Sequence, residues 1–311
     1  MTVGVVAVVG PTATGKSALS LALAHALGGE VVNADSMQLY RGMDIGTAKL
    51  TVAEREGVAH HVLSIWDVTE PASVAEYQRL ARAAIDDIRA RGRVPLLVGG
   101  SGLYVRAVLE RFEFPGTDAG LRAALEAELA DVGPGPLHAR LARVDPGAAA
   151  GILPSNGRRI VRALEVVELT GRGFTATLPD PAPYYPSVQL GVDLDTGVLD
   201  ERIAARVAQM WRRGLVDEVR HLADRGLRDG RTASRALGYR QVLRYLAGQC
   251  PQEQAAADTV RATRRFVRRQ RSWFRRDERI HWLDGAAPDL LRTALAAARA
   301  PRSRAQQARA Q

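Results

Sequence analysis

The chain has 311 residues, of which 46% are hydrophobic and 25% are charged, and this composition excludes a wholly disordered protein. The length allows a core domain and a substantial second lobe. The one cysteine, Cys250, excludes an internal disulfide and argues against a zinc module built on cysteines. No apolar run approaches the roughly 18 residues of a membrane span, and the apolar start lacks a basic leader and a cleavage site. We therefore expect a cytoplasmic protein without a membrane segment.

The net charge of +9 is distributed unevenly along the chain. Residues 201–311 carry 25 basic and 11 acidic side chains, whereas residues 1–200 carry 18 basic and 23 acidic ones. A general preference for arginine explains why 41 of the 43 basic residues are arginine, but it does not explain this asymmetry. The second part of the chain is therefore predicted to contact a polyanion such as a nucleic acid.

Apolar stretches alternate with helical patterns over the first 110 residues. Three short apolar stretches predict buried strands, namely 3–9, 30–34 and 94–98. A stretch with apolar residues at helical spacing follows each of them, namely 17–27, 73–91 and 103–109. Ser73 and Glu76 form a capping-box pattern at the start of the second helix. This alternation predicts an α/β fold, a doubly wound parallel sheet of the P-loop NTPase type.

The rest of the chain follows a different pattern. Residues 112–177 contain helical stretches broken by glycine and proline and no clear strand, which predicts an all-helical insertion. Four prolines in 178–186 mark the return to the core, where further strands are predicted at 188–194 and 279–283. No feature indicates an obligate protein partner, so we expect a monomer. We expect a P-loop core made of two segments, 1–113 and 185–290, and the segment 185–290 is expected to contain basic helices. Between them we expect a helical insertion domain at 114–184. A C-terminal helix with a polar, frayed tail is expected at 291–311.

Residues 10–17, Gly-Pro-Thr-Ala-Thr-Gly-Lys-Ser, match the pattern G-x-x-x-x-G-K-[ST] between a predicted strand and a predicted helix. In this motif the backbone N–H groups and the helix start bind phosphate, the lysine adds a positive charge, and the hydroxyl of Ser17 can ligate Mg²⁺. The motif is a nucleotide-binding and ATP-binding pattern, but by itself it predicts only a bound diphosphate or triphosphate. The candidate diphosphate ligands in it are Gly10, Thr12, Ala13, Thr14, Gly15, Lys16 and Ser17.

Two further polar residues follow strands whose carboxyl ends are expected to face the same crevice. Asp35 follows the second strand and could hold a metal through water, accept a proton from a nucleophile, or cap the next turn. The third strand is followed by Gly-Gly-Ser-Gly at 99–102, where an ATP-driven motor would carry an acidic residue. These glycines would let a bulky planar group approach the backbone. Ser101 could hydrogen-bond that group, cap the following helix, or do both.

Together these segments resemble the family of tRNA dimethylallyltransferases, also called tRNA isopentenyltransferases. The resemblance covers the chain from about residue 3 to residue 283, and it is carried by residues 10–17, 35–38, 42–49, 97–104, 158–165 and 235–241. The stretches 42–49, Gly-Met-Asp-Ile-Gly-Thr-Ala-Lys, and 235–241, Arg-Ala-Leu-Gly-Tyr-Arg-Gln, are the most specific. The resemblance implies transfer of a dimethylallyl group from dimethylallyl diphosphate to N6 of an adenosine. That adenosine lies directly 3′ of the anticodon, at position 37, in certain tRNAs, and diphosphate is released.

The resemblance also implies roles for individual residues. Asp35 matches the general base, and Ser101 stands where the family commonly has threonine. The P-loop and Arg206 match the groups that hold the diphosphate together with Mg²⁺. The tRNA-contacting positions implied are Asp35, Ser36, Met37, Gln38, Ser101, Arg122, Arg158, Arg159, Ile160, Val161, Arg162, Arg235, Ala236, Leu237, Gly238, Tyr239 and Arg240. The zinc finger of the eukaryotic relatives is absent, as the single cysteine requires.

Residues 260–279 form the most basic stretch of the chain. At helical spacing its nine arginines fall within an arc of about 160°, namely residues 261, 264, 265, 268, 269, 271, 275, 276 and 279. The opposite face carries Phe266, Val267, Trp273 and Phe274. We expect the apolar face to lie in the core and the arginines to contact the phosphates of the tRNA anticodon stem-loop, the alternative being a solvated face.

The sequence also contains a histidine pair, and it leaves two alternative functions open. The pair His60-His61 lacks neighbouring ligands for a metal, so we interpret it as structural. A kinase for a small molecule or nucleotide is the main alternative function, but it leaves the basic second part unexplained. The other alternative function is a non-catalytic RNA-binding protein that uses a nucleotide as a switch. Such a protein would not need Asp35 and Ser101 near the P-loop.

Overall fold

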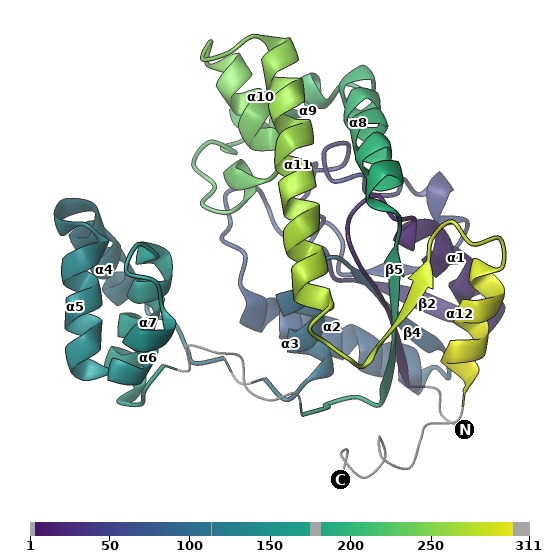
Figure 1. Cartoon of the computed structure of the whole chain (residues 1–311), viewed down its shortest axis with the longest axis horizontal. Helices are drawn as coiled ribbons and strands as arrows, with labels where there is room; N and C mark the ends of the chain where they lie inside the picture. Colours follow the sequence, from purple (N-terminus) through teal and green to yellow (C-terminus); the bar gives the residue numbers. More distant parts are fainter. Residues whose placement is uncertain (1–3, 113, 175–181, 301–311) are drawn as a thin grey trace. The chain divides into compact units, whose positions relative to one another are not determined.

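The computed structural model describes residues 4–112, 114–174 and 182–300, and the chain divides into two compact units. The first unit comprises Met1–Arg111 with Pro183–Gln311, and the second comprises Phe112–Ala182 (Figure 1). The expected bounds of the insertion, 114–184, differ from the bounds of the second unit by two residues at each end. The expected tail at 301–311 and the part of the proline-rich linker at 175–181 lie outside the described residues.

Six parallel strands form one sheet in the described part of the first unit, in the order β3-β2-β4-β1-β5-β6. Their bounds are β1 Val5–Val9, β2 Gly29–Asn33, β3 His60–His61, β4 Val94–Gly99, β5 Ser187–Asp193 and β6 Ile280–Asp284. The central strand β1 pairs with β4 and β5 and is buried along its whole length, as its apolar run indicates. The edge strand β3 was not predicted, because two histidines carry no hydrophobic pattern.

Helices cover both faces of this sheet, which confirms the doubly wound parallel fold. They are α1 Lys16–Leu27, α2 Val74–Ala90, α3 Gly102–Leu109 and α12 Leu290–Arg299. Neighbouring residues of β1 point to opposite faces. Val9 belongs to one hydrophobic cluster with Ile85 of α2, and Val8 belongs to the other with Leu23 of α1 and Ala294 of α12. Ser73 caps α2 as predicted, since its hydroxyl accepts the N–H of Glu76.

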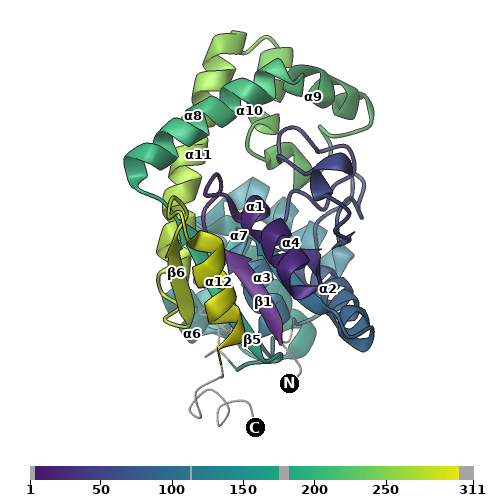
Figure 2. The same cartoon turned by 90° about the vertical axis from the view of Figure 1, so that its right-hand side faces the viewer.

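Four further helices of the first unit pack on one another beyond the edge of the sheet where the P-loop lies (Figure 2). They are α8 Thr196–Arg212, α9 Leu215–Asp224, α10 Tyr239–Leu246 and α11 Gln252–Phe274. The described part of the unit also contains two single 3-10 turns, η1 Ala53–Arg55 and η2 Ala233–Arg235. In the described ranges, no helix combines the length and the apolar character that crossing a bilayer requires.

The second unit is a small helical domain with its own core. Its helices are α4 Ala119–Val132, α5 Pro134–Val144, α6 Pro146–Gly151 and α7 Gly157–Thr170. Leucines of three of these helices bury their side chains in one cluster, among them Leu125, Leu137, Leu141 and Leu164. Its described residues contain no strand, as the glycine and proline pattern predicted.

Candidate active site

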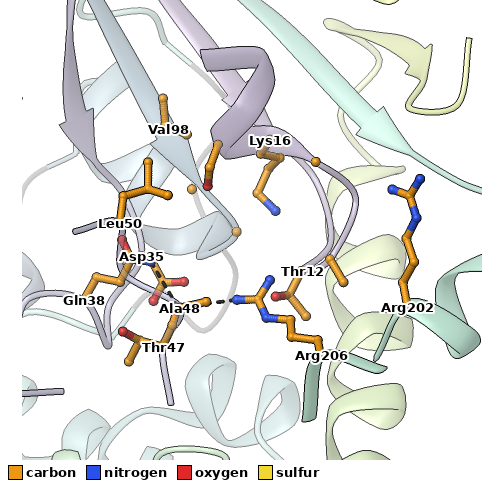
Figure 3. A pocket seen from close by; sticks show the side chains of 15 residues that line it. Thr12, Lys16, Asp35, Gln38, Thr47, Ala48, Leu50, Val98, Arg202 and Arg206 are labelled. Carbon is orange, nitrogen blue, oxygen red and sulfur yellow. Dashed lines mark hydrogen bonds between the residues drawn. The ribbon is translucent and has the colours of Figure 1, made fainter. Parts of the chain in front are cut away.

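A cavity of about 380 Å³ opens at the carboxyl ends of β1, β2 and β4 (Figure 3). In an open parallel sheet this is the edge where ligands bind. The P-loop forms one side of the cavity, and residues that follow β2 and β4 form another. Its lining comprises Thr12, Ala13, Gly15, Lys16, Ser17, Asp35, Gln38, Thr47, Ala48, Leu50, Val98, Gly99, Gly100, Arg202 and Arg206.

Backbone geometry explains the two glycines of the P-loop. Gly10 has a φ of +131°, and a Cβ built on it would lie 2.3 Å from the carbonyl oxygen of Val192 in β5. Gly15 has a φ of +97° and directly precedes α1. Because a glycine caps this helix, the N-cap residue has no side chain to accept the N–H groups of the first turn, which suits them to an anion. Thr14 is buried and its hydroxyl donates to the Pro11 carbonyl over 3.0 Å, so it can offer a ligand only its backbone.

Two cations from distant parts of the sequence line the cavity, Lys16 at the start of α1 and Arg206 in α8. Burial and the nearby guanidinium of Arg206 lower the pKa of Lys16 to about 8, although Asp35 and Asp193 act in the opposite direction. Burial also lowers the pKa of Arg206. Two partly desolvated positive charges of this kind are stabilised when an anion such as diphosphate enters between them.

Asp35 lines the same cavity, on the side contributed by β2, and Figure 3 shows its carboxylate beside Gln38. One carboxylate oxygen, Oδ1, accepts the N–H of Met37 over 2.9 Å, so Asp35 caps the following turn and faces the cavity at once. Its position depends on Gly99, because a Cβ at Gly99 would lie 2.2 Å from the carbonyl of Ala34. The close approach of the chain after β2 to the end of β4 therefore helps to bring Asp35 to the cavity that Gly99 and Gly100 also line.

Ser101 occupies the N-cap position of α3 but does not cap it. Within the described part of the chain, its hydroxyl accepts the N–H of Ser36 over 3.2 Å and donates to the Ser36 hydroxyl over 3.3 Å. The cavity lining found in the described ranges includes Gly100 but not Ser101. Ser101 thus holds the segment that follows Asp35, and of the alternatives considered for it, a side-chain cap of α3 is not what the structure shows.

The glycines around Ser101 make room for other parts of the chain. Gly99 and Gly100 also line the cavity, so the approach of a planar ligand to them stays a prediction. A Cβ at Gly100 would lie 2.4 Å from the amide nitrogen of Gln270, and one at Gly102 would lie 2.0 Å from the indole nitrogen of Trp273. Sequence reasoning missed Gln270, which is 6% exposed. Its Oε1 accepts the Thr12 N–H over 3.0 Å, and its Nε2 donates to the Gly100 carbonyl over 2.8 Å.

Only part of the predicted arginine face is free. Helix α11 ends at Phe274, and several arginines of the stretch form ion pairs inside the first unit. Arg271 and Arg275 both bind Asp193 at the end of β5, and Arg264 binds Asp200 of α8. Four arginines are exposed without a carboxylate partner among the described residues, namely Arg265, Arg268, Arg269 and Arg276. Trp273 was predicted to lie in the core but is 38% exposed.

The other residues implied in tRNA contact fall into exposed and buried groups. Arg235 and Arg240 are exposed in the first unit, as are Arg158 and Arg159 in the second. The side chains of several neighbours are buried and face the interior, namely Ile160, Val161, Ala236 and Tyr239, as is the backbone of Gly238. Contact of RNA with these side chains would therefore require the local fold to open, whereas the arginines are accessible as they stand.

Arg122 and Arg162 have a structural partner in the second unit, the fully buried Glu165. Burial opposes ionisation of this carboxyl group. Hydrogen bonds from Arg122, Thr117 and Arg162 nevertheless lower the pKa of Glu165 to about 2. The two guanidinium groups are thus partly neutralised, and both remain partly exposed.

The model of the IPP transferase family matches residues 38–277 of the chain. The chain belongs to this family. It is 77% identical to the tRNA dimethylallyltransferase of Salinispora arenicola over 95% of the chain and 86% of the relative. It is 67% identical to that of Thermobifida fusca over 94% of the chain and 93% of the relative. The resemblance seen in the sequence is confirmed, and membership of the IPP transferase family speaks against the kinase and the nucleotide switch.

Solved structures agree with this family assignment. The full-length tRNA isopentenylpyrophosphate transferase from Bacillus halodurans superposes with a TM-score of 0.71 at 43% identity, covering 95% of this chain and 94% of that one. A eukaryotic dimethylallyltransferase acting on tRNA gives a TM-score of 0.77 at 27% identity, covering 90% of this chain and 73% of that one. The family fold therefore extends over nearly the whole chain.

A magnesium ion in this member of the IPP transferase family would depend on the P-loop. Among the described residues no group of three or more His, Cys, Asp or Glu side chains could hold a metal. Ser17 is exposed at the start of α1 and lines the cavity, which suits a magnesium ion that takes most ligands from water and phosphate. His61 instead binds the buried Glu30 over 2.7 Å, in line with the structural role expected for the histidine pair.

Sequence reasoning missed several lining residues. Arg202 lies one turn before Arg206 on α8, and this spacing was the signal that could have identified it. Thr47, Ala48 and Leu50 belong to or follow the stretch 42–49, which was recognised as specific to the family but given no part in the site. Leu50 and Val98, together with Ala13 and Ala48, provide the apolar side chains of a lining that is both polar and apolar.

Proposed function

We propose that this enzyme transfers the dimethylallyl group of dimethylallyl diphosphate to N6 of the adenosine at position 37, directly 3′ of the anticodon, in certain tRNAs. The observation that carries the proposal is the placement of Asp35 and the pair Lys16 and Arg206 around one cavity. A base for the adenine amine and two cations for the leaving diphosphate therefore line the same cavity. The enzyme is proposed to act in the cytoplasm, as a monomer, on the anticodon stem-loop.

The proposed reaction forms a bond between N6 of adenine and C1 of the dimethylallyl group while the bond from C1 to the diphosphate oxygen breaks. The electron pair of that bond leaves with diphosphate, and Asp35 accepts the proton that N6 releases. An exocyclic adenine amine is a weak nucleophile, so a base at its proton assists the attack. Ser101 supports this step by holding Ser36, next to the base.

Charge on the leaving diphosphate is the other barrier to this reaction. Lys16, Arg206 and the N–H groups at the start of α1 are positioned to stabilise it. Bound Mg²⁺ would neutralise further charge on the phosphate oxygens, with the Ser17 hydroxyl as its protein ligand. We propose that the P-loop of this enzyme binds diphosphate and does not hydrolyse ATP.

The tRNA surface is proposed to consist of the accessible arginines. In the first unit these are Arg235 and Arg240 with four arginines of the α11 stretch, Arg265, Arg268, Arg269 and Arg276. In the second unit they are Arg158 and Arg159, with Arg122 and Arg162 partly exposed. Phosphate contacts of this kind position an RNA without reading its sequence. The target adenine would leave its stack to reach the cavity beside Asp35.

One labelling experiment tests this function. The enzyme is incubated with Mg²⁺ and bulk tRNA, together with dimethylallyl diphosphate labelled in the allyl group or with ATP labelled in the γ-phosphate. We expect the allyl label to enter the RNA and the phosphate label to remain outside it. Transfer of phosphate to RNA would support a kinase, and transfer of neither label would refute the proposal.

A further inference from the structure

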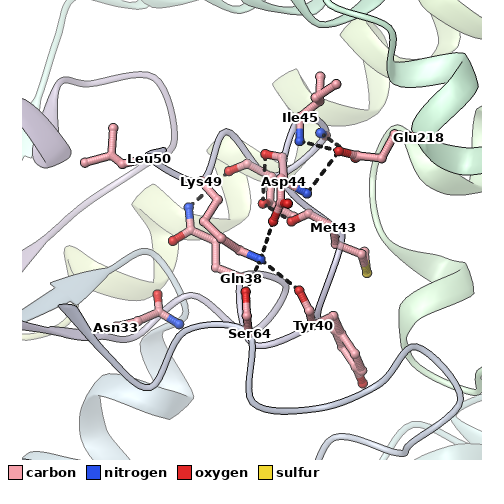
Figure 4. Close-up of polar contacts among 12 residues, drawn as sticks. Asn33, Gln38, Tyr40, Met43, Asp44, Ile45, Lys49, Leu50, Ser64 and Glu218 are labelled. Atoms are coloured by element: carbon pink, nitrogen blue, oxygen red, sulfur yellow. Dashed lines mark hydrogen bonds and ion pairs between the residues drawn. The ribbon is translucent and has the colours of Figure 1, made fainter. Parts of the chain in front are cut away.

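One carboxylate connects the cavity wall to the helices of the second half of the chain. Glu218 of α9 accepts four hydrogen bonds. Figure 4 shows its carboxylate beside Asp44 and Ile45. Its Oε2 accepts the N–H groups of Asp44 over 3.2 Å and Ile45 over 2.7 Å. Its Oε1 accepts the N–H of Gly46 over 3.2 Å and the hydroxyl of Tyr239 over 2.5 Å. A carboxylate has about four lone-pair sites, so all of them are used.

The segment held in this way continues directly into the cavity. The next residue, Thr47, lines the cavity, and its carbonyl accepts Nε2 of Gln38 over 3.1 Å and Nη2 of Arg206 over 3.5 Å. Gln38 and Arg206 line the cavity as well. The position of residues 44–46 therefore sets the carbonyl that orients two cavity side chains, one of them a proposed diphosphate ligand.

Tyr239 is the second anchor of the segment and is itself fully buried. Burial, reinforced by Glu218, raises the pKa of Tyr239 well above its ordinary value, so its hydroxyl remains a donor. A Cβ at Gly46 would lie 2.4 Å from the ring of Tyr239, which shows how closely backbone and ring approach. Tyr239 precedes the exposed Arg240 and belongs to the stretch 235–240 proposed to contact tRNA.

The other end of the segment is tied to the first part of the chain. The ammonium group of the buried Lys49 donates to the Tyr40 carbonyl and the Ser64 hydroxyl, each over 2.8 Å, and to the Asp44 carboxylate over 2.6 Å. These contacts hold the segment at its end toward Lys49. The contacts with Glu218 and Tyr239 bind it to α9 and α10. Helix α9 packs against α8, which carries Arg206, and α10 packs against α11, which carries exposed arginines.

We infer that Glu218 is a positioning residue for the diphosphate end of the cavity, which it sets through residues 44–47, and that Tyr239 acts through it. This assigns a role to the stretch 42–49, and it rests on the proposed function for the identity of the ligand. Removing the Glu218 charge should displace Thr47 and with it the Arg206 guanidinium. The effect should fall on diphosphate binding and on the KM for dimethylallyl diphosphate, and not on tRNA affinity.

Glu218→Gln tests the inference, because its amide keeps one acceptor oxygen but turns an NH₂ group toward two of the four donors. We expect the Kd for inorganic diphosphate with Mg²⁺, measured by calorimetry on the full chain, to rise by about tenfold or more. The KM for dimethylallyl diphosphate should rise similarly, while the Kd for tRNA stays within about twofold. Asp217→Asn is the matched control, since Asp217 lies on the same turn, is exposed and pairs with Arg220.

A purely structural role for Glu218 would give a different result. Glu218→Gln would then lower the melting temperature and the active fraction but leave the KM and the Kd for diphosphate at the values of Asp217→Asn, and this would overturn the inference. If Glu218→Gln fails to fold, Tyr239→Phe tests the inference instead. This variant keeps the aromatic ring against Gly46 and removes one of the four hydrogen-bond donors to Glu218. We expect a Kd for diphosphate raised about threefold, and an unchanged Kd would overturn the inference.

The double variant tests whether Tyr239 acts through Glu218. Combining Tyr239→Phe with Glu218→Gln should raise the Kd no further than Glu218→Gln alone, whereas additive effects would show independent roles. Diphosphate binding requires neither tRNA nor the allyl group. A wild-type enzyme that binds diphosphate but alkylates no tRNA would therefore refute the proposed function and leave this comparison valid.

Discussion

The backbone N–H of Thr12 in the P-loop donates a hydrogen bond of 3.0 Å to the side-chain oxygen of Gln270 in α11. The amide nitrogen of the same side chain donates to the Gly100 carbonyl over 2.8 Å. One buried amide thus joins the P-loop and the end of β4 to the helix that carries the exposed arginines Arg268 and Arg269. Gln270 therefore connects the phosphate-binding loop to the helix that carries a proposed RNA surface.

Gln270→Ala should destabilise the protein and weaken its use of dimethylallyl diphosphate. The change leaves the Thr12 N–H and the Gly100 carbonyl without their buried partner, at a cost of about 1–3 kcal/mol for each unsatisfied group. We expect a lower melting temperature and a higher KM for dimethylallyl diphosphate. Ser272→Ala, an exposed position two residues further on the same helix, is the control. Equal melting temperatures and KM values for the two variants would contradict this role of Gln270.

Asp35→Asn should reduce the rate of transfer by roughly 10²–10⁴-fold, the usual contribution of a general base. Asparagine keeps an oxygen that can accept the Met37 N–H, so the local turn is preserved, but it cannot accept the proton of N6. The tRNA Kd should stay within about tenfold of wild type. The check is the single-turnover rate with both substrates saturating, and a variant that retains more than about half of the wild-type rate would exclude Asp35 as the base.

Lys16→Arg should alter the pH dependence of diphosphate binding. In the free enzyme the pKa of Lys16 is lowered to about 8, so its charge is present below pH 8 and is lost as the pH rises through that value. A bound anion favours the charged form. Affinity for diphosphate should therefore fall above pH 8 in the wild type, beyond the change due to titration of diphosphate itself.

Arginine remains charged throughout this range, so Lys16→Arg should show only the titration of diphosphate. The measurement is the Kd for diphosphate at several pH values between 7 and 10 for both proteins. Parallel curves would mean that Lys16 does not titrate in this window. Lys16→Ala should bind diphosphate weakly at every pH while its tRNA affinity changes little.

Replacing Arg265, Arg268 and Arg269 together with glutamine should weaken binding of all tRNAs alike. All three are exposed, and glutamine preserves helix propensity and much of the side-chain stem. Each phosphate contact releases counterions, so the slope of log affinity against log salt should become shallower by up to about two to three units. Turnover at saturating tRNA should change little.

A matched variant distinguishes the exposed arginines from the paired ones. Arg271→Gln removes a charge from the same helix, but its guanidinium binds Asp193 and the Leu194 carbonyl. It should lower the melting temperature more than it changes the salt slope. If the triple variant is folded and keeps the wild-type slope and affinity, this face of α11 contacts only water.

The doubly wound core could be predicted from the sequence because local patterns decide it. Buried central strands such as β1 need apolar residues on both faces, and the helices after them need apolar residues at helical spacing. The P-loop could be recognised in the sequence for the same reason, because its glycines adopt backbone angles that other residues avoid. Asp35 followed from the rule that parallel strands end at a common edge, and the family resemblance added Arg206.

The contacts that support the site were decided by tertiary structure alone. Gln270 bonds a residue 258 positions away, and Glu218 bonds backbone groups more than 170 positions away, so no local period marks either one. A helical wheel placed nine arginines on one face, but it could not show which of them would meet Asp193 or Asp200. That depends on the packing of α11 against α8 and the end of β5, because an arginine next to a buried carboxylate becomes part of the fold, whereas one turned to solvent stays available to RNA.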